Sequence, residues 1–232
     1  MTFNFKDFPK DIPLYKYLKN EHADFLLEGK IRIGTLFYFR EIEQHGDEIG
    51  DSNEGKKEVF EDIKDLTIED PSSQNTLSKF AQKYIKLENT AQNTTFINCE
   101  LVEQQHSNNC FIYCMSKRFD RILGSQLYGN AHACIKIRSP YKFINCISKA
   151  INNCAVFVNL SSVIYGDRRQ AYGEHNNYHA SIIKPPLHKH HKEVRAIWTP
   201  KSQRENLHCL DIQIPVRYIK RYCELVYKID FD

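Results

Sequence analysis

From residue 94 onward, short runs of β-branched and aromatic residues follow one another, and they constrain the fold most. Seven of them are typical of strands: 94–103, 110–117, 133–138, 155–166, 193–199, 210–215 and 220–227. Two predicted helices, around 120–128 and 140–152, interrupt the series. Because strands and helices come in mixed order, we expect an α+β fold with mainly antiparallel mixed sheets and short helices.

The first third of the chain predicts a strand, a helix and a second strand. "PLYKYL" (13–18) is the first strand, and "IRIGTLFYFRE" (31–41) is the second. Between them a short helix begins at Asn20 as N-cap and stops at Gly29. Residues 42–72 predict a loop followed by a polar helical stretch. Apolar residues at helical spacing predict a further helix over 74–90.

Length and charge indicate one domain with an acidic insertion. The 232 residues suit a single domain, 1–232, and no internal repeat or linker divides them. Residues 41–70 contain twelve Asp or Glu and three Lys, a net charge of −9, so the rest of the chain carries +12. We therefore expect an acidic loop and helical insertion around 42–92. It is either a solvated surface or a surface for a cationic partner.

Composition excludes several classes of protein. No apolar run approaches 18 residues and the first residues are broken by charges, so neither a membrane span nor a secretory signal is expected. The eight cysteines lie mostly in apolar runs, as small hydrophobes do in a reducing compartment, which predicts a cytoplasmic protein. The nine glycines form neither a dinucleotide-binding fingerprint nor a Walker loop.

The acidic loop over 45–58 does not match a calcium-binding loop. A twelve-residue loop that starts at Asp47 places Ile49 at position 3 and Ser52 at position 6, where a ligand and a glycine are needed. The loop is either a surface turn or a lobe that covers a substrate.

The histidine run "LHKHHKEVRAIW" (187–198) admits three interpretations. An extended chain would place His188 and His190 on one side, a spacing that can chelate zinc. Lys189 and Lys192 add positive charge where a cation would bind, so no metal is predicted. The remaining interpretations are a basic loop that contacts phosphates or nucleic acid and a solvated turn.

The strand that follows the histidines places an acid and a base on one face. Alternation puts Val194, Ala196 and Trp198 on one side. Glu193 and Arg195 face the other way, either as a surface ion pair or as a carboxylate at the mouth of a cleft. Residues 120–137, with polar side chains between two strands, are a candidate pocket wall, although a helix packed on the core explains its leucines equally well.

Five segments in order carry a resemblance to known families. These are "PLYKYL", "ADFLLEGKIRIGTLFYFRE", "CFIYCMSKRFD", "LYGNAHACIKI" and "HKEVRAIW". Together they resemble an uncharacterised bacterial domain family, although the tryptophan expected before "YG" is missing and "EVR" stands for "EYR". The same order resembles ADP-ribosyltransferase-like proteins of bacterial toxin and phage-defence systems.

This second resemblance implies a site for NAD, used as a substrate, between the two leading strands. The first strand would contact NAD through Tyr15, Lys16 or Tyr17, although it lacks the His or Arg that the family has there. The second strand would contribute Thr35 or Tyr38, with Tyr38 in a catalytic role.

The late strand would contribute the catalytic Glu193. Its carboxylate would bind the ribose and stabilise the charge that develops as nicotinamide leaves. Arg195 would contact a phosphate or orient Glu193. His188, His190 and Lys192 would hold a phosphate or an acceptor, which is nucleic acid or protein.

Two other classes of function stay open on the sequence. The resemblance predicts a transferase that acts as a toxin or antiviral effector with an antitoxin or defence partner. The first alternative is a non-enzymatic module that binds nucleic acid or protein. The second alternative is a metal-dependent nuclease or hydrolase that uses His188 to His191.

Overall fold

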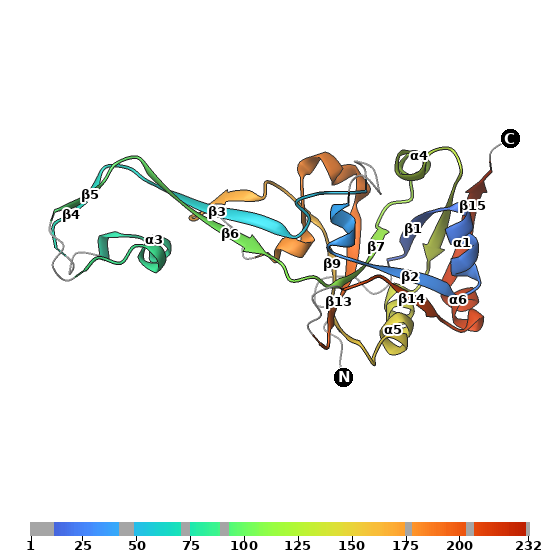
Figure 1. Cartoon of the computed structure of the whole chain (residues 1–232). Helices are drawn as coiled ribbons and strands as arrows, with labels where there is room; N and C mark the ends of the chain where they lie inside the picture. The colour runs from blue at the N-terminus through green and yellow to red at the C-terminus, as the bar shows by residue number, and fades with distance from the viewer. Residues whose placement is uncertain are drawn as a thin grey trace.

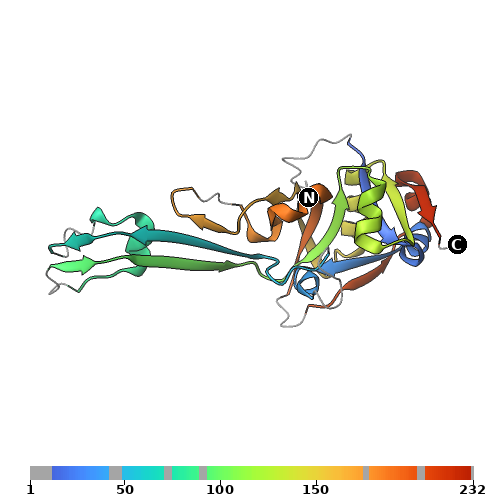
Figure 2. The same ribbon diagram turned by 90° about the horizontal axis from the view of Figure 1, so that it is seen from above.

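A body and an arm make up the molecule (Figure 1). The computed structural model describes residues 12–41, 49–70, 75–88, 93–174, 178–202 and 207–230. The body holds an eight-stranded sheet with helices on both faces, and the arm is a long hairpin that runs away from it (Figure 2). The fold is α+β, and its strand pairs are antiparallel except for two short parallel ones within the described chain.

The large sheet is built around the buried strand β7 (Phe111–Ser116). Its main path runs β14-β2-β7-β1-β8-β15, and β13 and β9 extend it from the other edge of β7. The remaining bounds are β1 (Leu14–Lys19), β2 (Lys30–Thr35), β8 (His132–Ile137), β9 (Ala155–Ser162), β13 (Glu193–Pro200), β14 (Leu210–Gln213) and β15 (Cys223–Ile229).

One face of the sheet carries the main core. Alternation along β13 sends Val194, Ala196 and Trp198 into it, as the sequence predicts. Helices α1 (Asn20–Leu27), α5 (Pro140–Ala150) and α6 (Val216–Tyr222) cover this face. Trp198 is fully buried, and its indole Nε1 donates to Ser148 Oγ of α5 at 2.8 Å. The other face packs against α4 (Arg121–Tyr128) through Leu123.

A gap opens in the sheet between β1 and β2. Both strands pair with the same edge of β7, but at opposite ends: Gly34 and Thr35 of β2 face Ile112 and Phe111, whereas Tyr15 of β1 faces Ser116. No described strand pairs with residues 113–115 along this edge. The two leading strands therefore diverge over the middle of β7.

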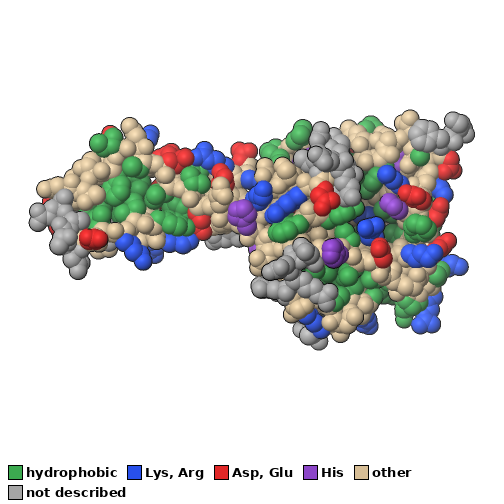
Figure 3. Space-filling model, in the orientation of Figure 1, with side chains coloured by type: hydrophobic (Ala, Val, Ile, Leu, Met, Phe, Trp, Pro, Cys, Tyr) green, Lys and Arg blue, Asp and Glu red, His purple; other side chains and the backbone are tan. Residues whose placement is uncertain are grey.

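The arm has a small core of its own. Strands β3 (Lys56–Ile63) and β6 (Cys99–His106) form its shaft, and β4 (Leu66–Ile68), β5 (Thr94–Phe96) and α3 (Lys79–Tyr84) form its end. Ile63, Ile68, Leu77 and Ala81 are buried together there, and hydrophobic side chains gather at this end (Figure 3).

Short elements join the arm to the body. They are β10 (Ile164–Tyr165), β11 (Arg169–Ala171), β12 (Ile183–Lys184) and the 3-10 helices η1 (Tyr38–Arg40), η3 (Ala180–Ile182) and η4 (Pro186–His191). Strand β11 runs parallel to β3, at the base of the arm. Within the described residues, every helix is too short or too polar to cross a membrane.

Several expectations about local structure are wrong. The acidic segment over 42–72 forms strands β3 and β4 in its described part rather than a helix, and the helix expected over 74–90 is only α3. Residues 42–48 and 71–74 lie outside the described residues. The expected insertion over 42–92 is, where it is described, an arm that reaches on to His106.

One expected boundary of the first helix also differs from the structure. Asn20 does not cap α1, because Lys19 is the N-cap and the Asn20 amide donates to Ile229 O and Asp230 Oδ1, both at 2.8 Å. Gly29 does end the helix: its φ is +88°, and a Cβ there would lie 2.1 Å from Ile214 O. Helix α6 occupies part of the expected final strand.

We expect Ile68→Ala to unfold the end of the arm and leave the body folded. Ile68 is 1% exposed within a small core that only arm residues form, so a cavity there costs about 2–5 kcal/mol of local stability. Hydrogen exchange should accelerate in β4, β5 and α3 but not in β7 or β13.

Ile135→Ala in β8 is the matched control, because Ile135 is buried in the main core. It should lower the protection of the whole sheet. Loss of protection in β7 for Ile68→Ala would show instead that arm and body unfold as one unit.

Candidate functional site

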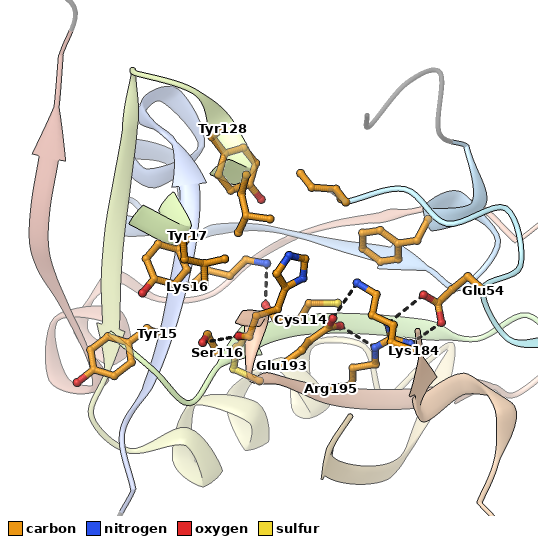
Figure 4. Close-up of a pocket in the computed structure, with 16 residues that line it drawn as sticks. Tyr15, Lys16, Tyr17, Glu54, Cys114, Ser116, Tyr128, Lys184, Glu193 and Arg195 are labelled. Atoms are coloured by element: carbon orange, nitrogen blue, oxygen red, sulfur yellow. Dashed lines mark hydrogen bonds and ion pairs between the residues drawn. The ribbon is translucent and has the colours of Figure 1, made fainter. Parts of the chain in front are cut away.

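A cavity of about 630 Å³, counted to its open mouth, lies over the gap in the sheet (Figure 4). Its floor is β7 and β13, and β1 and α4 form one wall. Glu54, which precedes the arm, and Lys184 of β12 lie on the opposite side (Figure 4), and Phe39 and Ile49 also belong to the lining. Four of the predicted site residues other than Glu193 line it: Tyr15, Lys16, Tyr17 and Arg195.

Glu193 and Arg195 reach the cavity because they alternate with core residues along β13. The strand pairs Glu193 with Ser116 and Arg195 with Cys114, and both side chains point away from the main core. They are 6% and 3% exposed. The interpretation as a surface ion pair is therefore wrong, and the alternative of a carboxylate in a cleft describes their position.

Arg195 joins two carboxylates. Its Nε donates to Glu193 Oε1 at 2.7 Å, and its Nη1 and Nη2 donate to the two oxygens of Glu54 at 2.7 and 3.0 Å. Nη1 also donates to Ser181 O at 2.5 Å. These bonds use most of the five guanidinium donors, so Arg195 orients Glu193 rather than standing ready for a phosphate.

Lys184 completes the cluster. Its ammonium lies 3.0 Å from Glu193 Oε2, so each oxygen of Glu193 faces one cation. Two buried carboxylates and two buried cations balance in charge, as burial of ionised groups requires. The sequence interpretation included neither Lys184 nor Glu54.

Glu54 is placed by a tight turn just before the arm. Its backbone N–H donates to Asp51 O at 2.8 Å, and its carbonyl accepts from Arg40 Nε at 2.8 Å. Gly55 follows with φ +72°, where a Cβ would lie 2.5 Å from Leu36 Cδ2. The chain can turn toward β3 here only because this residue has no side chain.

The cluster keeps Glu193 ionised. Burial by itself would raise the pKa of Glu193, but the charges of Arg195 and Lys184 outweigh burial and hold that pKa well below 4.5. Each oxygen accepts one bond from a cation and retains a lone pair. A ligand in the cavity therefore meets a fixed negative charge that can still accept a hydrogen bond.

Lys16 reaches from β1 to the middle of β7. Its ammonium donates to the carbonyl oxygen of Cys114 at 2.8 Å and lies 4.6 Å from the centre of the Tyr113 ring. Both residues belong to the stretch 113–115 of β7, with which no described strand pairs on the edge that faces β1 and β2. Burial lowers the pKa of Lys16. Lys16 is thus a third basic side chain in the lining, beside Lys184, Arg195 and two carboxylates, and burial disfavours its charged form.

Aromatic rings form much of the wall. Tyr17 is 4% exposed, and its hydroxyl is committed to Arg118 O at 2.8 Å and to the backbone N–H of Asp120 at 2.6 Å, so it offers only its ring. Tyr128 of α4, on the same side of the cavity as Tyr17 (Figure 4), and Phe39 also line the cavity. Burial raises the pKa of Tyr128, whose hydroxyl stays protonated.

Thr35 and Tyr38 are not brought into the cavity lining. Thr35 is the last residue of β2 and is 2% exposed, and its Oγ1 accepts from the backbone N–H of Tyr38 at 3.1 Å. Tyr38 belongs to η1 rather than to the expected strand, and its ring lies 5.8 Å from the Arg32 guanidinium. Neither residue therefore lines the cavity, contrary to the role that the resemblance implied for them.

The histidine run forms a 3-10 helix, not an extended segment or a solvated turn. His188 and His191 lie on one face of η4, both 6% exposed, with ring centres 5.2 Å apart. Only His191 lines the cavity, and its carbonyl accepts from Ser116 Oγ at 2.7 Å. His190 and Lys192 are outside the lining. Among the described residues, no three His, Cys, Asp or Glu side chains are grouped to hold a metal ion.

Comparisons of the chain with protein-family models, curated proteins and solved structures find no match.

We expect Glu193→Gln to destabilise the protein by about 3–5 kcal/mol at pH 7, because it leaves Lys184 buried without its counter-charge. The pKa of Glu193 is lowered in the folded state, so its contribution is complete above pH 4.5. It disappears as pH falls further, through the folded pKa. Urea unfolding of both proteins at pH 7, 5 and 3.5 should give a difference that shrinks only at the lowest pH.

A charge-balanced variant separates this effect from simple loss of packing. Lys184→Met together with Glu193→Gln removes one charge of each sign and should recover most of the lost stability. Glu224→Gln, an exposed acid on β15, should change stability by less than about 0.5 kcal/mol. A double variant as unstable as Glu193→Gln would contradict the proposed charge balance.

Proposed function

We propose that the cavity binds NAD and that the protein breaks the bond between nicotinamide and ribose, transferring ADP-ribose to a macromolecule or to water. The observation that carries the proposal is an ionised, buried Glu193 at the floor of an aromatic-walled cavity over the gap between β1 and β2. In the ADP-ribosyltransferase-like arrangement that the sequence resembles, NAD lies between two leading strands; here the first of them, β1, lines the cavity and supports the proposal.

The charges around the cavity suit the two ends of NAD. The pyrophosphate is anionic, and its charge would favour the protonated ammonium of Lys16, which lines the cavity. The nicotinamide ring is planar and cationic, and such a ring stacks favourably on Tyr or Phe. Tyr17, whose hydroxyl is already bonded, offers a fixed ring for this contact.

Glu193 would act on the charge that forms during the reaction. When the C–N bond to nicotinamide breaks, its electron pair leaves with the nicotinamide nitrogen and the ribose carbon becomes electron-poor. A carboxylate fixed by Arg195 and Lys184 stabilises that carbon and accepts a bond from a ribose hydroxyl without reorganising. Water or an acceptor group then attacks the same carbon and releases its proton to solvent.

The histidine run (188–192) would bind the acceptor of ADP-ribose. His191 reaches the cavity, while Lys189 and Lys192 of the same segment are exposed next to it. An anionic acceptor would be attracted there. An activity that consumes NAD or modifies a macromolecule would suit a toxin or a phage-defence effector, with a partner that restrains it.

Incubation of the purified protein with NAD, with and without added RNA, DNA or protein, tests the proposal. We expect nicotinamide release, measured by chromatography, and a rate at least about 100-fold lower for Glu193→Gln, because a fixed electrostatic contact to the transition state is lost. The NAD dissociation constant, measured by calorimetry, should change much less.

Two variants control for stability. The double variant Lys184→Met with Glu193→Gln should be folded but equally slow, and Glu224→Gln should match the wild type. Equal rates for wild type and Glu193→Gln would remove Glu193 from the mechanism. NAD binding with no nicotinamide release under any condition would indicate a binding module.

A further inference from the structure

A second cavity lies on the other side of the sheet, between helices α5 and α6. It measures about 820 Å³, counted to its open mouth, and its lining includes Lys142 and Lys149 of α5 and Tyr218 and Tyr222 of α6. These helices cover the main-core face, whereas Glu193 and Arg195 point from the opposite face. The groove between α5 and α6 is therefore separate from the NAD cavity proposed above.

The two helices concentrate positive charge. Residues 138–154 and 215–223, which contain α5 and α6, have no Asp or Glu and include six basic residues: Arg138, Lys142, Lys149, Arg217, Lys220 and Arg221. All six are exposed, and Lys and Arg side chains edge this part of the body (Figure 3). Glu224, 4.0 Å from Arg138, lies at the border of the patch. Such a surface attracts a polyanion.

Two aromatic rings lie within this charge. Tyr218 and Tyr222 are one helical turn apart, and their rings are parallel to within 3° with centres 6.4 Å apart. Arg217 and Arg221 lie over them, 5.1 and 5.9 Å from the ring centres. Both tyrosines are half-buried against the main core, which fixes the orientation of the rings. Fixed tyrosine rings and guanidinium planes are the surfaces on which unpaired bases stack.

We infer that the groove between α5 and α6 binds single-stranded nucleic acid. The lysines contact phosphates, and the tyrosines stack on bases that no complementary strand holds. A membrane surface is a poorer match for the same charge, because the apolar residues Phe143, Ile144 and Ile147 of α5 are buried in the core and cannot insert into lipid. Binding at this groove does not depend on the activity proposed for the NAD cavity.

Fluorescence anisotropy with a labelled twelve-nucleotide oligouridine, over a series of salt concentrations, tests this inference. We expect binding that weakens as salt rises. Lys142→Gln with Lys149→Gln should lower the slope of log K against log salt by about 1.4, from about 0.7 for each phosphate contact on a single strand. Tyr218→Ala with Tyr222→Ala should weaken binding about tenfold or more.

The controls separate stacking, charge and folding. Tyr218→Phe with Tyr222→Phe keeps the rings and should bind almost as the wild type does, whereas Tyr84→Ala with Lys86→Gln, two exposed residues of the arm, should leave binding unchanged. Oligouridine binding is measured in the absence of NAD, so failure of the NAD proposal leaves this result intact.

Three outcomes would overturn the inference. One is no binding at low salt, and another is binding that neither groove variant changes. The third is that the wild-type protein binds phosphatidylserine-containing vesicles but not oligouridine, and that the groove variants lose the vesicle binding. That result would assign the surface to a membrane.

Discussion

Arg195 is held between two carboxylates, Glu54 and Glu193, in a place from which water is almost excluded. A guanidinium so buried is tolerated only if both its charge and its donors are matched. The need for these partners ties three distant parts of the chain together: the turn before the arm, β13, and, through Lys184, the strand β12. The cavity has its shape because these segments must meet around one cation.

The periodic part of this arrangement follows from sequence. Alternation along residues 193–198 separates Trp198 from Glu193 and Arg195 without knowledge of any neighbour, and Gly29 marks the end of α1 because its conformation excludes a side chain. The partners of Arg195 do not follow. Glu54 is one acid among many in its segment, and Lys184 stands in an apolar run before two prolines. Nothing local distinguishes either from a solvated charge.

The errors in the sequence interpretation have a common cause. Residues 56–63 are charged enough to suggest a polar helix, yet they form β3 because β6 supplies a partner strand over its whole length. The histidines suggest an extended ligand set, yet η4 buries two of them against the body. In both cases a contact distant in sequence outweighs local preference.

The central position of β7 also decides when the site can exist. Strand β1 pairs with it from one end of the sequence and β13 from the other, and the bond between Arg195 and Glu54 spans 141 residues. Synthesis must therefore pass residue 195 before β13 can pair with β7 and complete the floor of the cavity. A chain that ends before β13 lacks both Glu193 and Arg195, so the charged cluster can form only after this long-range strand pair closes.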